Sequence, residues 1–438
     1  MTDTIFALST AAGRAGIAVL RLSGPKAQSA LQALAGRLPA PRRASLARFR
    51  DPASGEAIDQ GLMLLFPAPR SVTGEDVAEL HVHGSRAVVA ALLDSLGRMR
   101  GLRLAEPGEF ARRAFLNGKL DLTEVEGLAD LIAAETAAQR RQALRQLGGE
   151  LGRLCEGWRQ LLLAIQARLE AAIDFPEEDL PSDLLDNARA EAARLAAEIE
   201  TQLADARRGE RLRDGIAVAI LGPPNAGKSS LMNALARREV AITSAIAGTT
   251  RDVIEVALDL KGYPVVLADT AGLRTARDAI EEEGVRRARA RAASADLKLV
   301  LLDARQAAPD EALGALIDED ALVIANKIDL LPQGDPRPTG MIPLSVKTGE
   351  GMEDLLARLT AAVAERLAPG NAAVVTRARH RRALEDCVAA LARFARAALP
   401  ELAAEDLRLA VRALGRITGR VDVEDMLDVL FREFCIGK

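Results

Sequence analysis

The segment Gly222–Ser229 restricts the fold of this chain more than any other. It reads Gly-Pro-Pro-Asn-Ala-Gly-Lys-Ser and has the GxxxxGK[ST] spacing of a phosphate loop. The apolar run Ile216–Leu221 before it predicts a strand, and the residues after it predict a helix. Glycines let backbone amides turn toward phosphate oxygens, the helix N-terminus favours negative charge, and Lys228 adds a positive charge. The motif therefore predicts a nucleotide-binding α/β domain.

Two segments downstream predict how a base is recognised. Asn326–Asp329 reads Asn-Lys-Ile-Asp and follows the expected strand Leu322–Ala325, while Ser345–Lys347 follows the expected strand Met341–Leu344. The Asp329 carboxylate can accept two hydrogen bonds from the N1 and N2 donors of guanine, and adenine offers no such pair. The order of these motifs predicts GTP rather than ATP.

A third segment predicts a magnesium site. Asp269–Gly272 reads Asp-Thr-Ala-Gly and follows the expected strand Tyr263–Ala268. The Ser229 hydroxyl and the Asp269 carboxylate are oxygen groups of the kind that surrounds Mg²⁺ beside a nucleotide. Thr250 is the natural switch ligand, because its hydroxyl would reach Mg²⁺ only while the γ-phosphate is present.

The residue that orients the attacking water is not evident from the motifs. GTPases of the Ras kind place Gln directly after the Asp-x-x-Gly glycine, but Leu273 occupies that position here. The acidic run Glu281–Glu283 follows shortly after and could supply a carboxylate. On spacing alone it fits equally well the solvated start of a helix, where acidic residues oppose the positive end of the helix dipole.

Composition and the pattern of apolar residues divide the 438 residues of the chain into four regions. Residues 1–117 mix short strands such as Ile17–Leu22 and Gly61–Phe66 with glycine and proline. Residues 118–213 and 367–438 are rich in helix-forming residues, and residues 214–366 alternate strands and helices as parallel α/β sheets do. We expect the α/β unit to be inserted into a helical domain, and four separate units in series are the alternative.

Composition excludes some classes of protein. The formal net charge of −4 gives no global electrostatic case for nucleic acid, although a local basic face stays open. The N-terminus lacks the features of a signal peptide, and no window offers the roughly 18 uninterrupted apolar residues of a membrane span. Three widely separated cysteines argue against a disulfide framework, so we expect a cytoplasmic protein with no membrane association.

Motifs outside the nucleotide segments carry a resemblance to a known family. They include the terminal Cys-Ile-Gly-Lys at 435–438, Thr-Gly-Glu-Asp at 73–76, Pro-Gly-Glu-Phe at 107–110 and Phe-Leu-Asn-Gly-Lys-Leu-Asp-Leu at 115–122. With Gly13, Arg14 and Gly16, the switch string Gly248–Asp252 and Asn225, they make the whole chain resemble the bacterial tRNA modification GTPase family MnmE, also called TrmE.

The resemblance implies roles for the nucleotide-binding residues. Asn225, Ser244, Ile246 and Thr249 match the positions that ligate K⁺ where two GTPase domains meet, Ser229 and Thr250 match Mg²⁺ ligands, and Glu281 and Lys228 match catalytic positions. The implied GTP contacts are Asn225, Ala226, Gly227, Lys228, Ser229, Ser230, Ser244, Ala245, Ile246, Ala247, Gly248, Thr249, Thr250, Asp269, Thr270, Ala271, Gly272, Asn326, Lys327, Asp329, Ser345, Val346 and Lys347.

The resemblance also implies an activity beyond GTP hydrolysis. Residues 1–117 are expected to be a dimerisation domain that binds a 5-formyl- or methylene-tetrahydrofolate at Arg21, Glu79, Lys119 and Lys438. The chain would form a homodimer and work with the FAD-dependent partner MnmG, in a heterotetramer, on tRNA. Together they would add an aminomethyl or carboxymethylaminomethyl group to C5 of the wobble uridine, while K⁺-stimulated hydrolysis switches the conformation.

Two other functions were weighed. A ribosome-assembly GTPase acting as a binding module also carries the Asn-Lys-x-Asp motif, but the acidic balance of this chain and its C-terminal sequence argue against it. The full set of Mg²⁺ ligands argues against a scaffold that only binds GTP.

Weaker signals stay open. His81 and His83 fit a half-exposed strand better than a zinc site, and Cys435 fits a small buried hydrophobe better than a nucleophile. The basic run 377–382 fits contact with tRNA phosphates as well as it fits a solvated helix start.

Overall fold

A computed structural model describes most of the chain. The described residues are 3–174, 184–238, 240–242, 255–269, 293, 295–306, 308–309, 311–332, 338–367, 374–421, 431, 434 and 437. They form two compact units. The first contains Met1–Ala129, Gln146–Gln166 and Arg408–Lys438, and the second contains Asp130–Arg145 and Ala167–Leu407.

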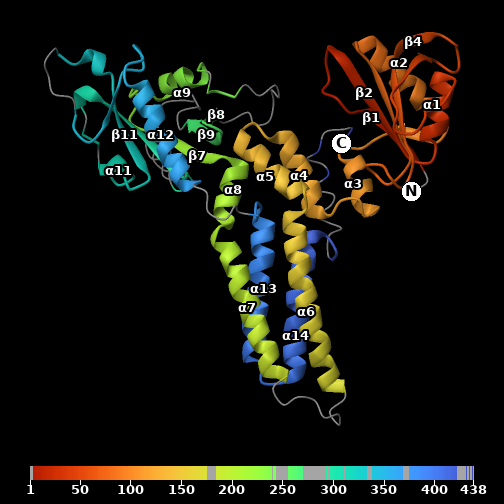
Figure 1. Ribbon diagram of the computed structural model, residues 1–438. Helices are drawn as coiled ribbons and strands as arrows, with labels where there is room; N and C mark the ends of the chain where they lie inside the picture. The colour runs from red at the N-terminus through yellow and green to blue at the C-terminus, as the bar shows by residue number, and fades with distance from the viewer. Residues whose placement is uncertain are drawn as a thin grey trace, which may run out of the picture. The chain divides into compact units, whose positions relative to one another are not determined.

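The first unit is built on a six-stranded sheet with the order β3-β4-β5-β2-β1-β6 (Figure 1). Only the β1–β6 pair is parallel among its neighbouring strands. The strands are β1 Thr4–Leu8, β2 Ala15–Ser23, β3 Ser45–Arg50, β4 Ala57–Phe66, β5 Val77–Gly84 and β6 Leu102–Leu104.

Alternation along the strands separates the two faces of this sheet. Leu20 and Leu22 of β2 and Leu80 of β5 join the apolar core beneath helices α1 (Ala27–Ala35) and α2 (Arg86–Gly97). The residues between them, Arg21 and Glu79, therefore lie on the opposite face. This face is the one where the sequence predicts the folate contacts.

Two of the helices that follow the sheet begin at reciprocal caps between side chains and backbone amides. The bounds of the helices after the sheet are α3 Glu109–Leu116, α4 Leu122–Ala133, α5 Ala137–Leu147, α6 Glu150–Asp174 and α14 Pro400–Thr418. Asp121 accepts from the amide of Glu124 at 2.8 Å, and the Glu124 carboxylate accepts in return from the amide of Asp121 at 2.7 Å. Thr136 and Gln139 repeat this reciprocal pattern before α5. The second cap lies between α4 and α5, within residues 118–213, where the sequence is rich in helix-forming residues.

The second unit contains a second six-stranded sheet, ordered β12-β11-β10-β7-β9-β8. All neighbouring pairs are parallel except β8 with β9. Its strands are β7 Ile216–Leu221, β8 Glu255–Leu260, β9 Tyr263–Asp269, β10 Leu297–Asp303, β11 Ala321–Asn326 and β12 Ile342–Leu344.

Helices of the second unit cover this sheet and extend beyond it. Apolar residues of α9 and α12 pack with β7 into one large core, and the other face has a smaller apolar cluster near α11. Helices α7 and α13 lie side by side (Figure 1). The bounds are α7 Leu184–Ala204, α8 Ala206–Asp214, α9 Lys228–Ala236, α11 Glu311–Gly314, α12 Met352–Arg366 and α13 Ala378–Arg396, with short 3-10 helices at Ala304–Gln306 and Ile328–Leu330.

The predicted fold class is confirmed: an N-terminal α/β domain, a helical part and a P-loop domain with a mostly parallel sheet. The strand expected at Ile216–Leu221 has those bounds, and the other expected strands differ by one or two residues or, for β4, extend further. Residues 422–434, part of the helix-rich region expected at 367–438, lie almost wholly outside the described residues. Within the described part, no helix has both the length and the hydrophobicity needed to cross a bilayer.

Candidate functional site

The parallel strands of the second unit end at one edge of their sheet. The phosphate loop follows β7, Asp269 ends β9, Asn326 ends β11, and Ser345 follows β12. Ile220 and Asp269 are register partners, so the backbone of Asp269 lies beside the start of the phosphate loop. Ligand sites of open α/β sheets lie outside the carboxyl ends of the strands. The predicted nucleotide motifs are therefore brought together at the edge where a ligand binds.

Two glycines let the phosphate loop fit its surroundings. Gly222 has φ 146° and Gly227 has φ 103°, which are conformations that side chains disfavour. A Cβ at Gly222 would overlap the carbonyl oxygen of Leu301, and one at Gly227 would overlap the side-chain nitrogen of Asn326. Alanine at either position would displace the loop from β10 or β11. Packing of the loop against β10 and β11 therefore requires glycine at both positions, in addition to the requirement that the motif makes for phosphate binding.

Lys228 is held close to the loop that precedes it. Its Nζ donates to the carbonyl oxygens of Gly222 at 2.7 Å and Pro223 at 2.9 Å. Lys228 also begins α9, whose first-turn residues Ser229 and Ser230 are exposed. A positive charge, a helix N-terminus and exposed hydroxyls at one point form a site for a polyanion with a bound cation.

Asn326 joins the phosphate end of the site to the base end. It is 2% exposed, donates from Nδ2 to the carbonyl oxygen of Ala226 at 2.8 Å and accepts at Oδ1 from the amide of Val346 at 3.2 Å. These bonds use both ends of its amide. Asn326 therefore positions the two loops, a role that the motif alone did not distinguish from direct contact with the base.

Asp329 presents an exposed carboxylate beside the loop that follows β12. The buried Ser345 hydroxyl donates to its Oδ1 at 2.6 Å, and the same hydroxyl accepts from the amide of Thr348 at 3.2 Å. A carboxylate fixed by one hydroxyl and open to solvent can accept the paired donors of guanine. The base-reading role of Asp329 stays a prediction.

One residue at this edge was missed by the sequence reasoning. Asp303 ends β10, and its carboxylate accepts from Lys327 Nζ at 2.9 Å. Hydrogen bonds from the Arg305 side chain, together with Lys327, hold the pKa of Asp303 well below its usual range. The signal that could have found it is its place at the end of the apolar run Leu297–Leu302, on the same edge as the known motifs.

Several predicted contacts lie outside the described residues, so they remain predictions. They are Ser244, Ala245, Ile246, Ala247, Gly248, Thr249, Thr250, Thr270, Ala271, Gly272 and Glu281 of the nucleotide site, the side chain of Asp269, Lys438 of the folate site and Cys435.

Arg21 and Glu79 lie opposite each other in the sheet of the first unit. Nε of Arg21 donates to Oε1 of Glu79 at 3.0 Å, and the Arg21 guanidinium carbon lies 5.9 Å from the centre of the Phe110 ring. His81 Nε2 lies 3.3 Å from the other Glu79 oxygen. The arrangement combines a cation, a carboxylate and an aromatic ring on a sheet face away from α1 and α2.

The remaining folate prediction concerns segments far apart in the sequence. Exposed Lys119 follows the segment in which Asn117 donates to the carbonyl oxygen of Thr73 at 2.7 Å. The Ser9 hydroxyl donates to the carbonyl oxygen of Gly437 at 2.9 Å, directly after β1, which pairs with the strand that carries Arg21. Gly437 is thus placed beside the N-terminal sheet, one residue before Lys438.

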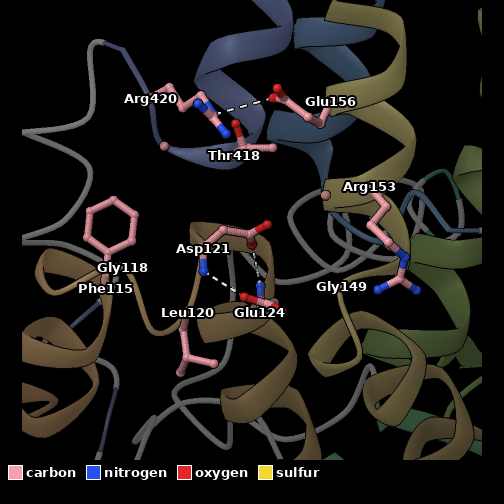
Figure 2. Close-up of a pocket in the computed structure, with 12 residues that line it drawn as sticks. Phe115, Gly118, Leu120, Asp121, Glu124, Gly149, Arg153, Glu156, Thr418 and Arg420 are labelled. Atoms are coloured by element: carbon pink, nitrogen blue, oxygen red, sulfur yellow. Dashed lines mark hydrogen bonds and ion pairs between the residues drawn. The ribbon is translucent and has the colours of Figure 1, made fainter. Parts of the chain in front are cut away.

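A separate cavity of about 480 Å³ lies elsewhere in the first unit (Figure 2). Asp121, Glu124, Glu156, Arg153 and Arg420 contribute its charged groups, and burial raises the pKa of Glu124. The Glu156 carboxylate faces Arg420 at 3.4 Å. Arg21, Glu79 and Lys119 do not line this cavity. The capping pair at its centre already stabilises the start of α4.

The two histidines and two arginines of the basic run make contacts within the protein. His83 pairs with Asp59 at 2.9 Å, whereas His81 faces Glu79, so the two histidines have different carboxylate partners. In the basic run, Arg377 pairs with Asp130 at 2.6 Å and Arg381 with Glu210 at 3.0 Å. Both arginines serve packing between helices of the second unit.

The phosphate loop, Asn326, Asp329 and Ser345 on this sheet define a P-loop GTPase domain. The family models called MnmE helical domain and GTP-binding protein TrmE N-terminus match residues 122–435 and 4–119. The chain belongs to the tRNA modification GTPase MnmE family.

Full-length relatives support this assignment. The tRNA modification GTPase MnmE of Parvibaculum lavamentivorans is 61% identical over 442 residues, covering 100% of both chains. That of Paramagnetospirillum magneticum is 60% identical over 445 residues, again with 100% of both chains covered. Among solved structures, the G domain of the T. maritima FeoB iron transporter is 26% identical and covers 34% of this chain and 98% of that one, with a TM-score of 0.24.

Proposed function

We propose that this chain hydrolyses GTP and couples the hydrolysis cycle to modification of the wobble uridine of certain tRNAs. The observation that carries the proposal is the geometry of the second unit, where the base-reading carboxylate of Asp329 and the phosphate loop lie on one sheet edge, tied by Asn326. Relatives that match the chain along its full length carry the name tRNA modification GTPase MnmE.

Two described residues, Ser229 and Asn225, supply exposed oxygen groups that suit the proposed Mg²⁺ and K⁺. Ser229 and Asp269 would hold Mg²⁺ together with Thr250, since hydroxyl and carboxylate oxygens suit this ion. Asn225 lies in the loop with φ 63° and is exposed, so its amide oxygen is available for K⁺ together with Ser244, Ile246 and Thr249. K⁺ at this place supplies positive charge where negative charge develops in the transition state.

The residues of the protein supply the rest of the hydrolysis chemistry. Lys228 exchanges its two loop carbonyls for phosphate oxygens when GTP binds, which keeps its charge beside the β- and γ-phosphates. Glu281 orients the attacking water, a role that Leu273 cannot fill. Thr250 and Gly272 respond to the presence of the γ-phosphate, and this response changes the conformation of the chain.

The first unit provides the site for the one-carbon donor. Arg21 and Lys119 bind the carboxylates of a tetrahydrofolate derivative, and Glu79 accepts hydrogen bonds from its pterin edge. The position of Gly437 beside β1 supports a contribution from Lys438. The chain acts as a homodimer with the FAD-dependent partner MnmG, and the two together act on tRNA in the cytoplasm.

Nucleoside analysis tests this function. Mass spectrometry of tRNA from cells that lack the chain should show loss of the aminomethyl or carboxymethylaminomethyl group at wobble uridine. A plasmid copy of the parent sequence should restore it, and a copy carrying Lys228→Ala should not. Persistence of the modified nucleoside in the deletion strain would exclude the proposal.

A further inference from the structure

The Asp303 carboxylate pairs with two basic side chains at the edge of the nucleotide site. Lys327 Nζ donates to its Oδ2 at 2.9 Å, while Arg305 donates from Nε to Oδ1 at 2.9 Å and from Nη2 to Oδ2 at 2.7 Å. The side chains of Asp303, Lys327 and Arg305 are 19%, 27% and 53% exposed. Arg305 is thus the solvent-facing partner, and Lys327 is the partner within the base-reading motif.

The backbone conformation of Lys327 links this ion pair to the position of Asp329. Lys327 has φ 67°, a left-handed conformation that a lysine adopts at a free-energy cost. It stands between Asn326, which ties the loops together, and Asp329, which faces the base. The direction of the chain at Lys327 therefore decides where the Asp329 carboxylate lies. A restraint on the Lys327 side chain is also a restraint on that turn.

We propose that Asp303 is a positioning residue for the guanine nucleotide. It holds Lys327, and through Lys327 the Asn326–Asp329 turn, in the conformation that receives the base. Register supports this route, since Asp303 pairs directly with Asn326 across β10 and β11. The inference rests on the proposed function, because it assumes that the site binds guanine nucleotides. Arg305 fixes the Asp303 carboxylate from the solvent side and does not reach the turn.

The same strand offers a matched control. Lys298, near the start of β10, pairs with Asp318 at 2.5 Å. This pair has the same chemistry as Asp303 with Lys327 but lies about 17 Å away, given the rise of an extended strand over five residues. Asp318→Asn therefore removes a comparable ion pair without touching the nucleotide edge.

The first test compares Asp303→Asn with Asp318→Asn in the full chain. A fluorescent GDP analogue measures affinity, and phosphate release measures KM and kcat for GTP. We expect Asp303→Asn to weaken GDP binding and raise KM about three- to tenfold, the range for a partly exposed charged hydrogen bond, with kcat within about twofold. Asp318→Asn should bind within about twofold of the parent. Equal affinity of Asp303→Asn and the parent overturns the proposal.

A double-mutant cycle separates positioning from general stability. If Asp303 acts through Lys327, the variant Lys327→Ala with Asp303→Asn should bind GDP as weakly as Lys327→Ala alone. Losses that multiply would show that Asp303 acts by another route and would overturn the proposal. Should Asp303→Asn fail to fold, Asp303→Glu moves the carboxylate by one methylene and enters the same cycle with the same two outcomes. If the parent binds no GDP at all, the proposed function fails instead, which is a different result.

Discussion

At the scale of single residues, Asp329 offers the clearest test of base recognition. Replacing Asp329 by Asn exchanges an acceptor for a donor, so xanthine, which carries an oxygen at position 2, should become the preferred base. We expect GTP affinity to fall and XTP affinity to rise in Asp329→Asn, as measured by competition against a fluorescent nucleotide. Asp354→Asn, on an exposed carboxylate of α12, serves as control. Unchanged GTP affinity in Asp329→Asn would mean that the base is read elsewhere.

Asn225 permits a second test at the residue scale. Its exposed position in the loop and the presence of Leu273 in place of a water-orienting Gln motivate a dependence on K⁺. Phosphate release by the parent should be fast in K⁺ and hardly detectable in Na⁺ at the same ionic strength. Asn225→Ala should be slow in both salts while it still binds GDP. Equal rates for the parent in the two salts would remove the potassium hypothesis.

The sequence predicted the motifs that the structure brings to one sheet edge, namely the phosphate loop, Asn326, Asp329 and Ser345, and the reason is physical. Each motif follows an apolar run, and parallel strands place their carboxyl ends together, so local patterns were enough to place the phosphate loop and Asp329. The end of the run Leu297–Leu302 places Asp303 at this edge, but its pairing with Lys327 depends on β10 lying beside β11, which no local pattern shows. The different roles of Asn326 and Asp329 were missed for a similar reason, because they depend on burial. Asn326 is buried and ties two loops together, whereas Asp329 is exposed.

At the scale of elements, caps decide where helices begin. The sequence from Leu122 to Ile173 contains few helix breakers, and the spacing of its apolar residues alone would favour nearly continuous helix. The structure divides it into α4, α5 and α6, and the segments Asp121–Glu124 and Thr136–Gln139 have the spacing of capping boxes. This signal was present in the sequence. Periodicity outweighed it because apolar residues continue across both helix starts.

The Thr136 cap gives a prediction for α5. Its side chain is 3% exposed and accepts from the amide of Gln139 at 3.3 Å. Thr136→Ala should cost about 1 kcal/mol of local stability, so hydrogen exchange of the α5 amides should quicken roughly fivefold. Thr136→Ser keeps the hydroxyl and should exchange like the parent. No change in exchange for Thr136→Ala would show that the Gln139 side chain is sufficient for capping.

At the scale of the whole molecule, a residue near the C-terminus contacts a residue near the N-terminus. Gly437 contacts Ser9, although 428 positions separate them, and both belong to the first compact unit. The sequence could not show this contact without the resemblance, because no pattern in the last four residues indicates where they pack. The predicted domain boundaries at 117, 213 and 366 stay predictions, since the compact units follow contacts rather than these positions.

Separate sites within one chain should give separable losses of function. Lys119→Ala or Lys438→Ala removes a charge from the folate site, and losing a charged hydrogen bond of roughly 1.5–3 kcal/mol would weaken folate binding about 10- to 150-fold. GTP binding should be unaffected, because neither lysine belongs to a nucleotide motif. Glu281→Ala should do the reverse, lowering hydrolysis by about 100-fold or more with folate and GTP binding intact.

All three variants should lose tRNA modification, because the proposed function requires both the one-carbon donor and the hydrolysis cycle. Calorimetry with a stable folate analogue, GTP turnover and nucleoside analysis measure the three properties on the same preparations. Normal folate binding by Lys438→Ala would show that the C-terminal residue does not reach the folate site, despite the contact of Gly437 with Ser9. If Glu281→Ala hydrolyses no GTP yet modifies tRNA at the parental rate, hydrolysis and modification are independent activities of the chain.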